Sequence, residues 1–121
     1  MTSLHAAANS GDLHRVKFLI NRGTNIDTQT SDHWTALHRA VQKQHEDVVR
    51  FLIDNGADCN ITNNAGQTPL HVACCNDNVL IVLLLVEGHA EINPKVFYFL
   101  FYDVQLNNLR IEFFIFVRNQ V

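Results

Sequence analysis

The chain has 121 residues, 47% of them hydrophobic, which is enough for one domain with a buried core. Nine Lys and Arg residues against twelve Asp and Glu residues give a formal net charge of −3. The basic residues form no run that would follow a phosphate backbone or an anionic membrane surface, so the composition argues against nucleic acid as a partner.

One motif occurs three times at equal intervals: TSLHAA from Thr2, TALHRA from Thr35 and TPLHVA from Thr68. The Thr hydroxyl predicts a helix N-cap in each copy, and Pro69 suits the first helical position of the third copy. Polar segments at 9–12, 42–44 and 76–78 predict the end of this helix. The segments LHRVKFLI, EDVVRFLI and VLIVLLLV then predict a second helix in each unit.

Gly23 and Gly56 predict left-handed ends for the second helices of the first two units. The polar segments TNIDTQTSDH and ADCNITNNAG that follow predict turn-rich connectors. In the third unit His89 takes the place of this glycine, and Gly88 stands one residue earlier. We therefore expect Gly88 to adopt a positive φ, because that conformation costs glycine least.

The TPLHVA motif, its repeat interval of about 33 residues and NGADCN at Asn55 to Asn60 resemble ankyrin repeats. The resemblance implies an all-α, ankyrin-type solenoid of helix-turn-helix repeats with projecting hairpin loops. It divides a domain at 1–95 into repeats at about 2–34, 35–67 and 68–95. Such units must stack, because a single unit cannot bury its own apolar face.

The family resemblance also implies a protein–protein interaction module or scaffold, which binds a partner through its concave face and loop tips. Carried over position by position, the candidate partner-binding residues are Asn9, Ser10, Ser31, Asp32, Trp34, Gln42, Lys43, Asn64, Ala65, Gln67, Cys75 and Asn76. Trp34 has two interpretations: an aromatic anchor of an interface, or a ring that covers the carbons of neighbouring loops. The partner would be another protein, of unknown identity.

Three histidines share a register, His5, His38 and His71, but stacked repeats place them roughly 10 Å apart, too far to share a metal ion. The resemblance implies that they bond to the backbone of the neighbouring loop. The histidines without a common register are expected to be solvated: His14, His33, His45 and His89. The sequence has no phosphate loop, metal-ligand spacing or nucleophile motif, so we expect no enzyme, metal site or cofactor.

The three cysteines are an odd number, and two of them, Cys74 and Cys75, are adjacent, which is typical of a reduced intracellular protein. Cys74 is expected in the core. No apolar segment opens the chain as a signal peptide would. These features predict a cytoplasmic protein, with the nucleus as the alternative.

Residues 96–121 contain six of the eight Phe and both Tyr residues, in apolar runs too short to span a membrane. The composition favours strand, with a turn at Asn107–Asn108, and helix is the alternative. We expect this non-repeat tail to cap the third unit, where Leu80 and Leu83 replace charged residues of the second. A truncated or misread end is the other interpretation. The chain is expected to be a monomer, with self-association through the tail as the alternative.

Two alternatives to a self-contained binding module remain open. The chain is a fragment of a larger ankyrin-repeat protein whose effector or catalytic domain lies elsewhere, or it is a substrate of asparaginyl hydroxylation. The candidate modification sites are Asn60 and Asn93, which each follow an acidic residue by two positions and a leucine by eight. That pattern is similar to hydroxylated asparagines in ankyrin repeats.

Overall fold

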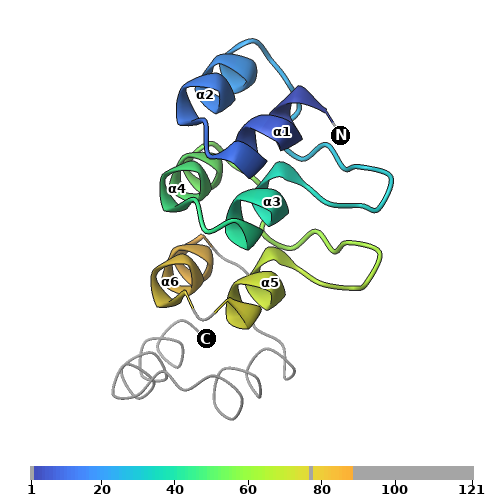
Figure 1. Ribbon diagram of the computed structural model, residues 1–121, viewed down its shortest axis with the longest axis vertical. Coiled ribbons are helices and arrows are strands. Elements are labelled where there is room, and N and C mark those ends of the chain that lie inside the picture. The colour runs from blue at the N-terminus through green and yellow to red at the C-terminus, as the bar shows by residue number, and fades with distance from the viewer. Residues whose placement is uncertain (1, 77, 89–121) are drawn as a thin grey trace.

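The computed structural model describes residues 2–76 and 78–88, which form a stack of helix pairs (Figure 1). The inner layer consists of the first helix of each pair: α1 (Ser3–Ser10), α3 (Ala36–Gln42) and α5 (Pro69–Cys75). The outer layer consists of the second helices: α2 (Leu13–Asn21), α4 (Glu46–Asp54) and α6 (Val79–Glu87). Equivalent helices begin at equal intervals along the chain. The predicted all-α solenoid is therefore confirmed for these residues.

Side chains cap most of these helices at their N-termini. The hydroxyls of Thr2, Thr35 and Thr68 accept the backbone N–H of the histidine three residues later, at 3.4, 3.2 and 3.4 Å. Asp12 and Asn78 cap α2 and α6 in the same way, at 3.1 and 3.2 Å. These bonds satisfy N–H groups that lack a partner within the helix, so the helix starts are fixed by local sequence.

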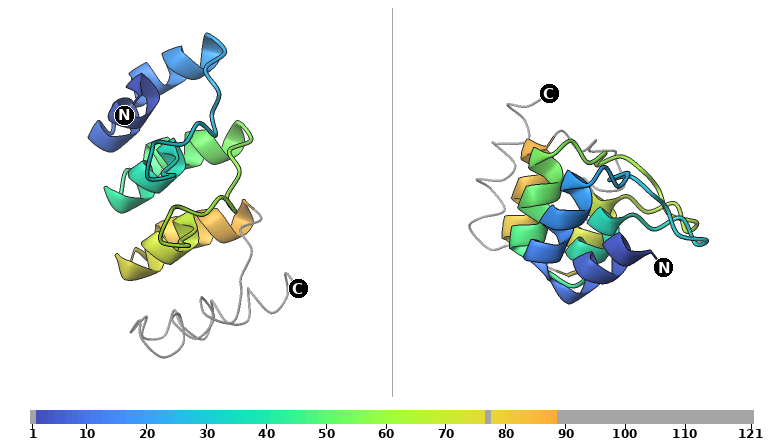
Figure 2. Two further views of the ribbon diagram at one scale, coloured as in Figure 1. Left: turned by 90° about the vertical axis from the view of Figure 1, so that its right-hand side faces the viewer. Right: turned by 90° about the horizontal axis from the view of Figure 1, so that it is seen from above.

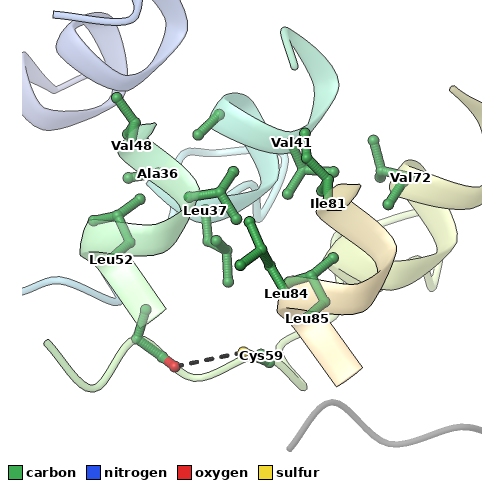
Figure 3. Packing of buried hydrophobic residues seen from close by; sticks show 14 of the residues in the cluster. Ala36, Leu37, Val41, Val48, Leu52, Cys59, Val72, Ile81, Leu84 and Leu85 are labelled. Carbon is green, nitrogen blue, oxygen red and sulfur yellow. Dashed lines mark hydrogen bonds between the residues drawn. The ribbon is translucent and has the colours of Figure 1, made fainter. Parts of the chain in front are cut away.

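The hydrophobic core runs the length of the stack, between the two layers and between successive repeats. The leucine of the repeated motif is fully buried in all three units, at Leu4, Leu37 and Leu70, and Leu52 and Leu85 of the outer layer are equally buried. Figure 3 shows this packing where the second repeat meets the third. Because each unit covers the apolar face of its neighbour, the repeats stabilise one another.

The helix ends confirm part of the glycine prediction and overturn the rest. Gly23 and Gly56 are left-handed, with φ of 93° and 85°, as predicted. The expectation for Gly88 is wrong, since its φ is −79° and its N–H continues the helical pattern to the Leu84 carbonyl at 3.0 Å. Gly88 is equivalent to Asn55, the C-cap with a φ of −101° that precedes Gly56. The register of the repeat, rather than the residue type, decides its conformation.

The two described hairpin loops, residues 22–35 and 55–68, project to one side of the helix layers (Figure 2). Each is closed by a backbone hydrogen bond of 2.9 Å, from Thr30 N–H to the Trp34 carbonyl and from Asn63 N–H to the Gln67 carbonyl. Asn64 N–H donates to the Asp32 carbonyl of the preceding loop at 3.1 Å. Successive loops are therefore tied to one another as well as to the helices.

The expected tail, residues 96–121, lies outside the described residues, as do His89 and Asn93. Leu80, expected to lie beneath the tail, is 44% exposed, and Leu83 is half-buried. In the described segments no helix has the length and apolar character needed to cross a membrane.

Candidate partner-binding surface

The candidate surface lies where the hairpin loops meet the inner layer. Each loop leads directly into the N-terminus of the next inner helix, so loop tips and inner helices share one side of the array (Figure 1). Seven predicted residues are exposed on it: Ser10, Ser31, Gln42, Lys43, Asn64, Ala65 and Cys75. The other five predicted residues are half-buried: Asn9, Asp32, Trp34, Gln67 and Asn76.

Several of the half-buried residues hold neighbouring repeats together. The Asn76 side-chain amide donates to the carbonyls of Val41 and Gln42 at 3.3 and 3.1 Å. The Gln67 carbonyl accepts from His38 Nε2 at 2.9 Å. The Asn76 side chain is therefore costly to redirect toward a partner, because its amide would lose these two bonds, whereas the Gln67 contact is made by the backbone. The exposed residues are therefore the more available part of the surface.

Trp34 packs in a cluster with His38, Arg39 and Asp32. Of these, only Trp34 and Asp32 are among the surface residues predicted from the sequence. The Trp34 ring is 5.4 Å from the His38 ring, and the guanidinium carbon of Arg39 stands 4.5 Å from its centroid. Arg39 Nη2 is 3.5 Å from Asp32 Oδ2. The ring packs on the core, as the covering interpretation expects, and remains partly exposed at the loop base, while a role as an interface anchor stays a prediction.

Arg39 is a half-buried residue beside the candidate surface that the sequence prediction did not include. A signal for it exists: the equivalent residues in the first and third units are Ala6 and Val72, so only the second unit has a charge at this position. The Thr30 hydroxyl donates a hydrogen bond to Asp32, and this bond, with a smaller effect of the Arg39 charge, lowers the pKa of the Asp32 carboxyl. The Asp32 side chain is therefore anionic at neutral pH, opposite the Arg39 cation.

Two histidines of the repeated motif, His5 and His38, have the structural role predicted for them. Their Nε2 atoms lie 2.9 Å from the carbonyls of Trp34 and Gln67 in the following loop. A carbonyl only accepts, so Nε2 carries the proton, and His38 Nδ1 accepts the Thr35 N–H at 3.2 Å. Burial lowers the pKa of both rings, which keeps them neutral at pH 7.

The prediction of solvated histidines is confirmed for His14 and His33, which are exposed, and is wrong for His45. His45 is half-buried, and its Nε2 donates to the Asn9 carbonyl of the first repeat at 3.0 Å. Its ring lies against Gly11, where a Cβ atom would stand 2.6 Å from Nδ1. His45 thus joins two repeats, a role that depends on a glycine far away in sequence.

The described residues contain no group of His, Cys, Asp and Glu side chains arranged to hold a metal ion. Burial raises the pKa of the Cys59 thiol to about 11, and Cys74 is buried as predicted, whereas Cys75 is exposed. A pocket of about 210 Å³ between α4 and α6 belongs to the outer layer. The candidate modification site Asn60 is exposed, and its N–H is bonded to Asp58 Oδ1 at 2.8 Å.

Stacked helix pairs with hairpin loops on one side define the class of helical repeat solenoids. Within that class the chain belongs to the ankyrin repeat family, because the sequence pattern described as ankyrin repeats (3 copies) matches residues 1–96. The chain is also similar to the crystal structure of the human ASB11 ankyrin repeat domain, with 35% sequence identity and a TM-score of 0.71. That likeness covers 75% of this chain and 41% of the other, so the chain spans less than half of that domain. No curated protein sequence matches the chain.

Proposed function

We propose that the chain is a protein-binding module or scaffold that holds its partner on the loop tips and inner helices, rather than an enzyme. Ankyrin repeats are generally protein-interaction modules. The observation that carries the proposal is the row of exposed side chains on one side of the array, which stand on helices and loops fixed by inter-repeat hydrogen bonds. A rigid surface of this kind loses little conformational freedom on binding, which favours affinity.

The test compares two variants with the same change of charge. Gln42→Glu with Ala65→Glu alters the proposed surface, and His14→Glu with Asn21→Glu alters exposed positions of the outer helix α2. Partners captured from lysate of the source cells are quantified by mass spectrometry, and thermal unfolding checks that both variants fold. We expect the first variant alone to lose partners. Equal retention or equal loss by both variants would refute the proposed surface.

The compartment we propose is the cytoplasm, because an odd number of cysteines, two of them adjacent in the chain, suits a reducing environment. Fluorescence of the tagged full chain at its native expression level tests this. Signal confined to a secretory compartment would contradict the proposal.

Asn60 supports a second proposal, that the module is a substrate of asparaginyl hydroxylation. It is exposed in the second hairpin loop, where a modifying enzyme has access to its side chain. Mass spectrometry of protein from its own cells tests the proposal, and the absence of an added oxygen at Asn60 would contradict it. Asn93 belongs to the same experiment.

A further inference from the structure

The central inner helix carries two cations on one face. Arg39 lies in α3 and Lys43 is its C-cap residue, four residues later, so the two cations lie one turn apart at the C-terminal end of the helix. The three inner helices contain no Asp or Glu, although the chain as a whole has a net charge of −3. The residues that hold the position of Arg39 in the first and third units, Ala6 and Val72, are uncharged. The inner layer is thus locally cationic at the middle of the array.

The Arg39 guanidinium is held in place but only partly neutralised. It stacks on Trp34, and its one ion pair among the described residues, with Asp32, has an N–O distance of 3.5 Å. That is longer than an N–H···O hydrogen bond of about 2.7–3.2 Å. Its Nε is buried without a hydrogen-bond partner in the described part of the chain. Most of the donor capacity of this side chain is therefore unused.

Asp32 Oδ2 stays beyond the usual hydrogen-bond distance from Arg39. The other carboxylate oxygen, Oδ1, accepts a hydrogen bond from the Thr30 hydroxyl, which holds the carboxylate at the hairpin. The Arg39 side chain is 18% exposed while Nε is buried, which leaves the two Nη groups as the end that a partner can reach. Because Nη2 faces Asp32 at 3.5 Å, Nη1 is the group left to pair with a carboxylate of a partner, beside the Trp34 ring.

We propose that Arg39 and Lys43 anchor an acidic segment of the partner protein along α3. One carboxylate of the segment pairs with Nη1 of Arg39 beside the Trp34 ring, and a second lies one helical turn away at Lys43. This proposal rests on the proposed function and names the chemistry of its partner. Two cations are too few to hold a phosphate polymer at physiological salt, which favours a peptide.

The probe is a library of random peptides displayed on phage and selected on the full wild-type chain. The variants are Arg39→Gln, Lys43→Gln and the control Lys17→Gln, which removes one positive charge from the outer helix α2. Lys43 is exposed, so its variant tests the proposal even where Arg39→Gln disturbs folding. Selected peptides are also synthesised with amides in place of their carboxylates, which tests the pairing without any change to the protein.

We expect the selected peptides to be enriched in Asp and Glu. Their dissociation constants should rise about tenfold with Arg39→Gln and about threefold with Lys43→Gln, and stay unchanged with Lys17→Gln. The amide versions should lose binding on the wild-type protein. A single-stranded thymidine oligonucleotide should bind more weakly than the peptides.

Peptides without acidic enrichment that still lose binding to the Gln42→Glu, Ala65→Glu variant would overturn the acidic segment and leave the proposed function standing. An oligonucleotide that binds the wild-type chain more tightly than every peptide, and that loses binding to the Arg39→Gln variant, would show that the two cations bind phosphate. That result would also overturn the acidic segment. Failure to select any peptide on the wild-type chain would count against both proposals.

Discussion

Replacement of Gly11 by Ala tests the contact between the first and second repeats. Gly11 has a φ of 76°, and a Cβ atom there would lie 2.6 Å from His45 Nδ1. Since non-bonded heavy atoms pack at about 3.5–4.0 Å, the ring must move by about 1 Å. Gly23 is the matched control, because its φ is 93° and nothing lies within 4 Å of a Cβ built there.

Both substitutions carry the cost of a left-handed alanine, about 1–2 kcal/mol. Gly11→Ala adds about 1–3 kcal/mol for overpacking against the ring. It adds about 0.5–1.5 kcal/mol more where the displaced ring loses its hydrogen bond to the Asn9 carbonyl. We therefore expect Gly11→Ala to lower the free energy of unfolding by about 1.5–4.5 kcal/mol more than Gly23→Ala.

The assay is urea unfolding at pH 7 followed by circular dichroism, with both substitutions also made in a His45→Ala background. Without the ring, Gly11→Ala should cost no more than Gly23→Ala, because the coupling between positions 11 and 45 is gone. If the two alanines destabilise the wild-type background equally, within about 0.5 kcal/mol, the contact between His45 and Gly11 does not constrain the array.

Three further predictions concern the histidines and cysteines. His38→Ala should lower the free energy of unfolding, measured in urea, by about 3–5 kcal/mol, because it leaves a cavity and removes the bond to the Gln67 carbonyl. The exposed His14→Ala is the control, and an equally small loss of stability in both variants would contradict the prediction. Since burial lowers the pKa of His5 and His38 from 6.5, their contribution to stability is present above pH 6.5 and is lost as the pH falls below it, because the unfolded chain then binds protons that the folded chain excludes. Urea unfolding at pH 7.5 and 5.5 measures this, and a chain more stable at pH 5.5 would refute it. Under native conditions a thiol reagent should label Cys75 first and reach the buried Cys59 and Cys74 only in denaturant, and peptide mapping measures this. Rapid labelling of Cys59 under native conditions would be inconsistent with the raised pKa of its thiol.

The features predicted correctly from sequence depend on contacts close in the chain or on the repeat itself. A Thr that caps the histidine three residues later needs no knowledge of the tertiary structure, and the constant interval of the repeat then places every equivalent helix. The bond from His38 to the next loop followed from the family resemblance. Gly88 was mispredicted because the glycine preference for positive φ was given more weight than its register in the repeat.

Pairings between repeats were less accessible to sequence reasoning. The burial of His45 follows from Gly11, which belongs to the preceding repeat, and neither residue alone indicates the contact. Arg39 was visible as a departure from Ala6 and Val72, but its stacking on Trp34 depends on how the first hairpin loop folds back over α3. Residues of the binding surface were placed by analogy with the family, and their roles in binding stay predictions.

The contact between Gly11 and His45 makes the order of the repeats matter. One repeat later, Gln44 holds the place of Gly11 with a φ of 61°, and Asn78 holds the place of His45. At this second interface the side-chain amide of Asn78 donates to Gln44 Oε1 at 3.3 Å. The earlier repeat thus contributes the longer side chain there, whereas in the first interface the earlier repeat contributes a glycine and the later one contributes the His45 ring. Loss of the second unit would set Asn78 against Gly11, with space to spare, whereas duplication of that unit would force His45 onto Gln44. At this contact the loss of one unit is therefore accommodated more readily than the gain of one.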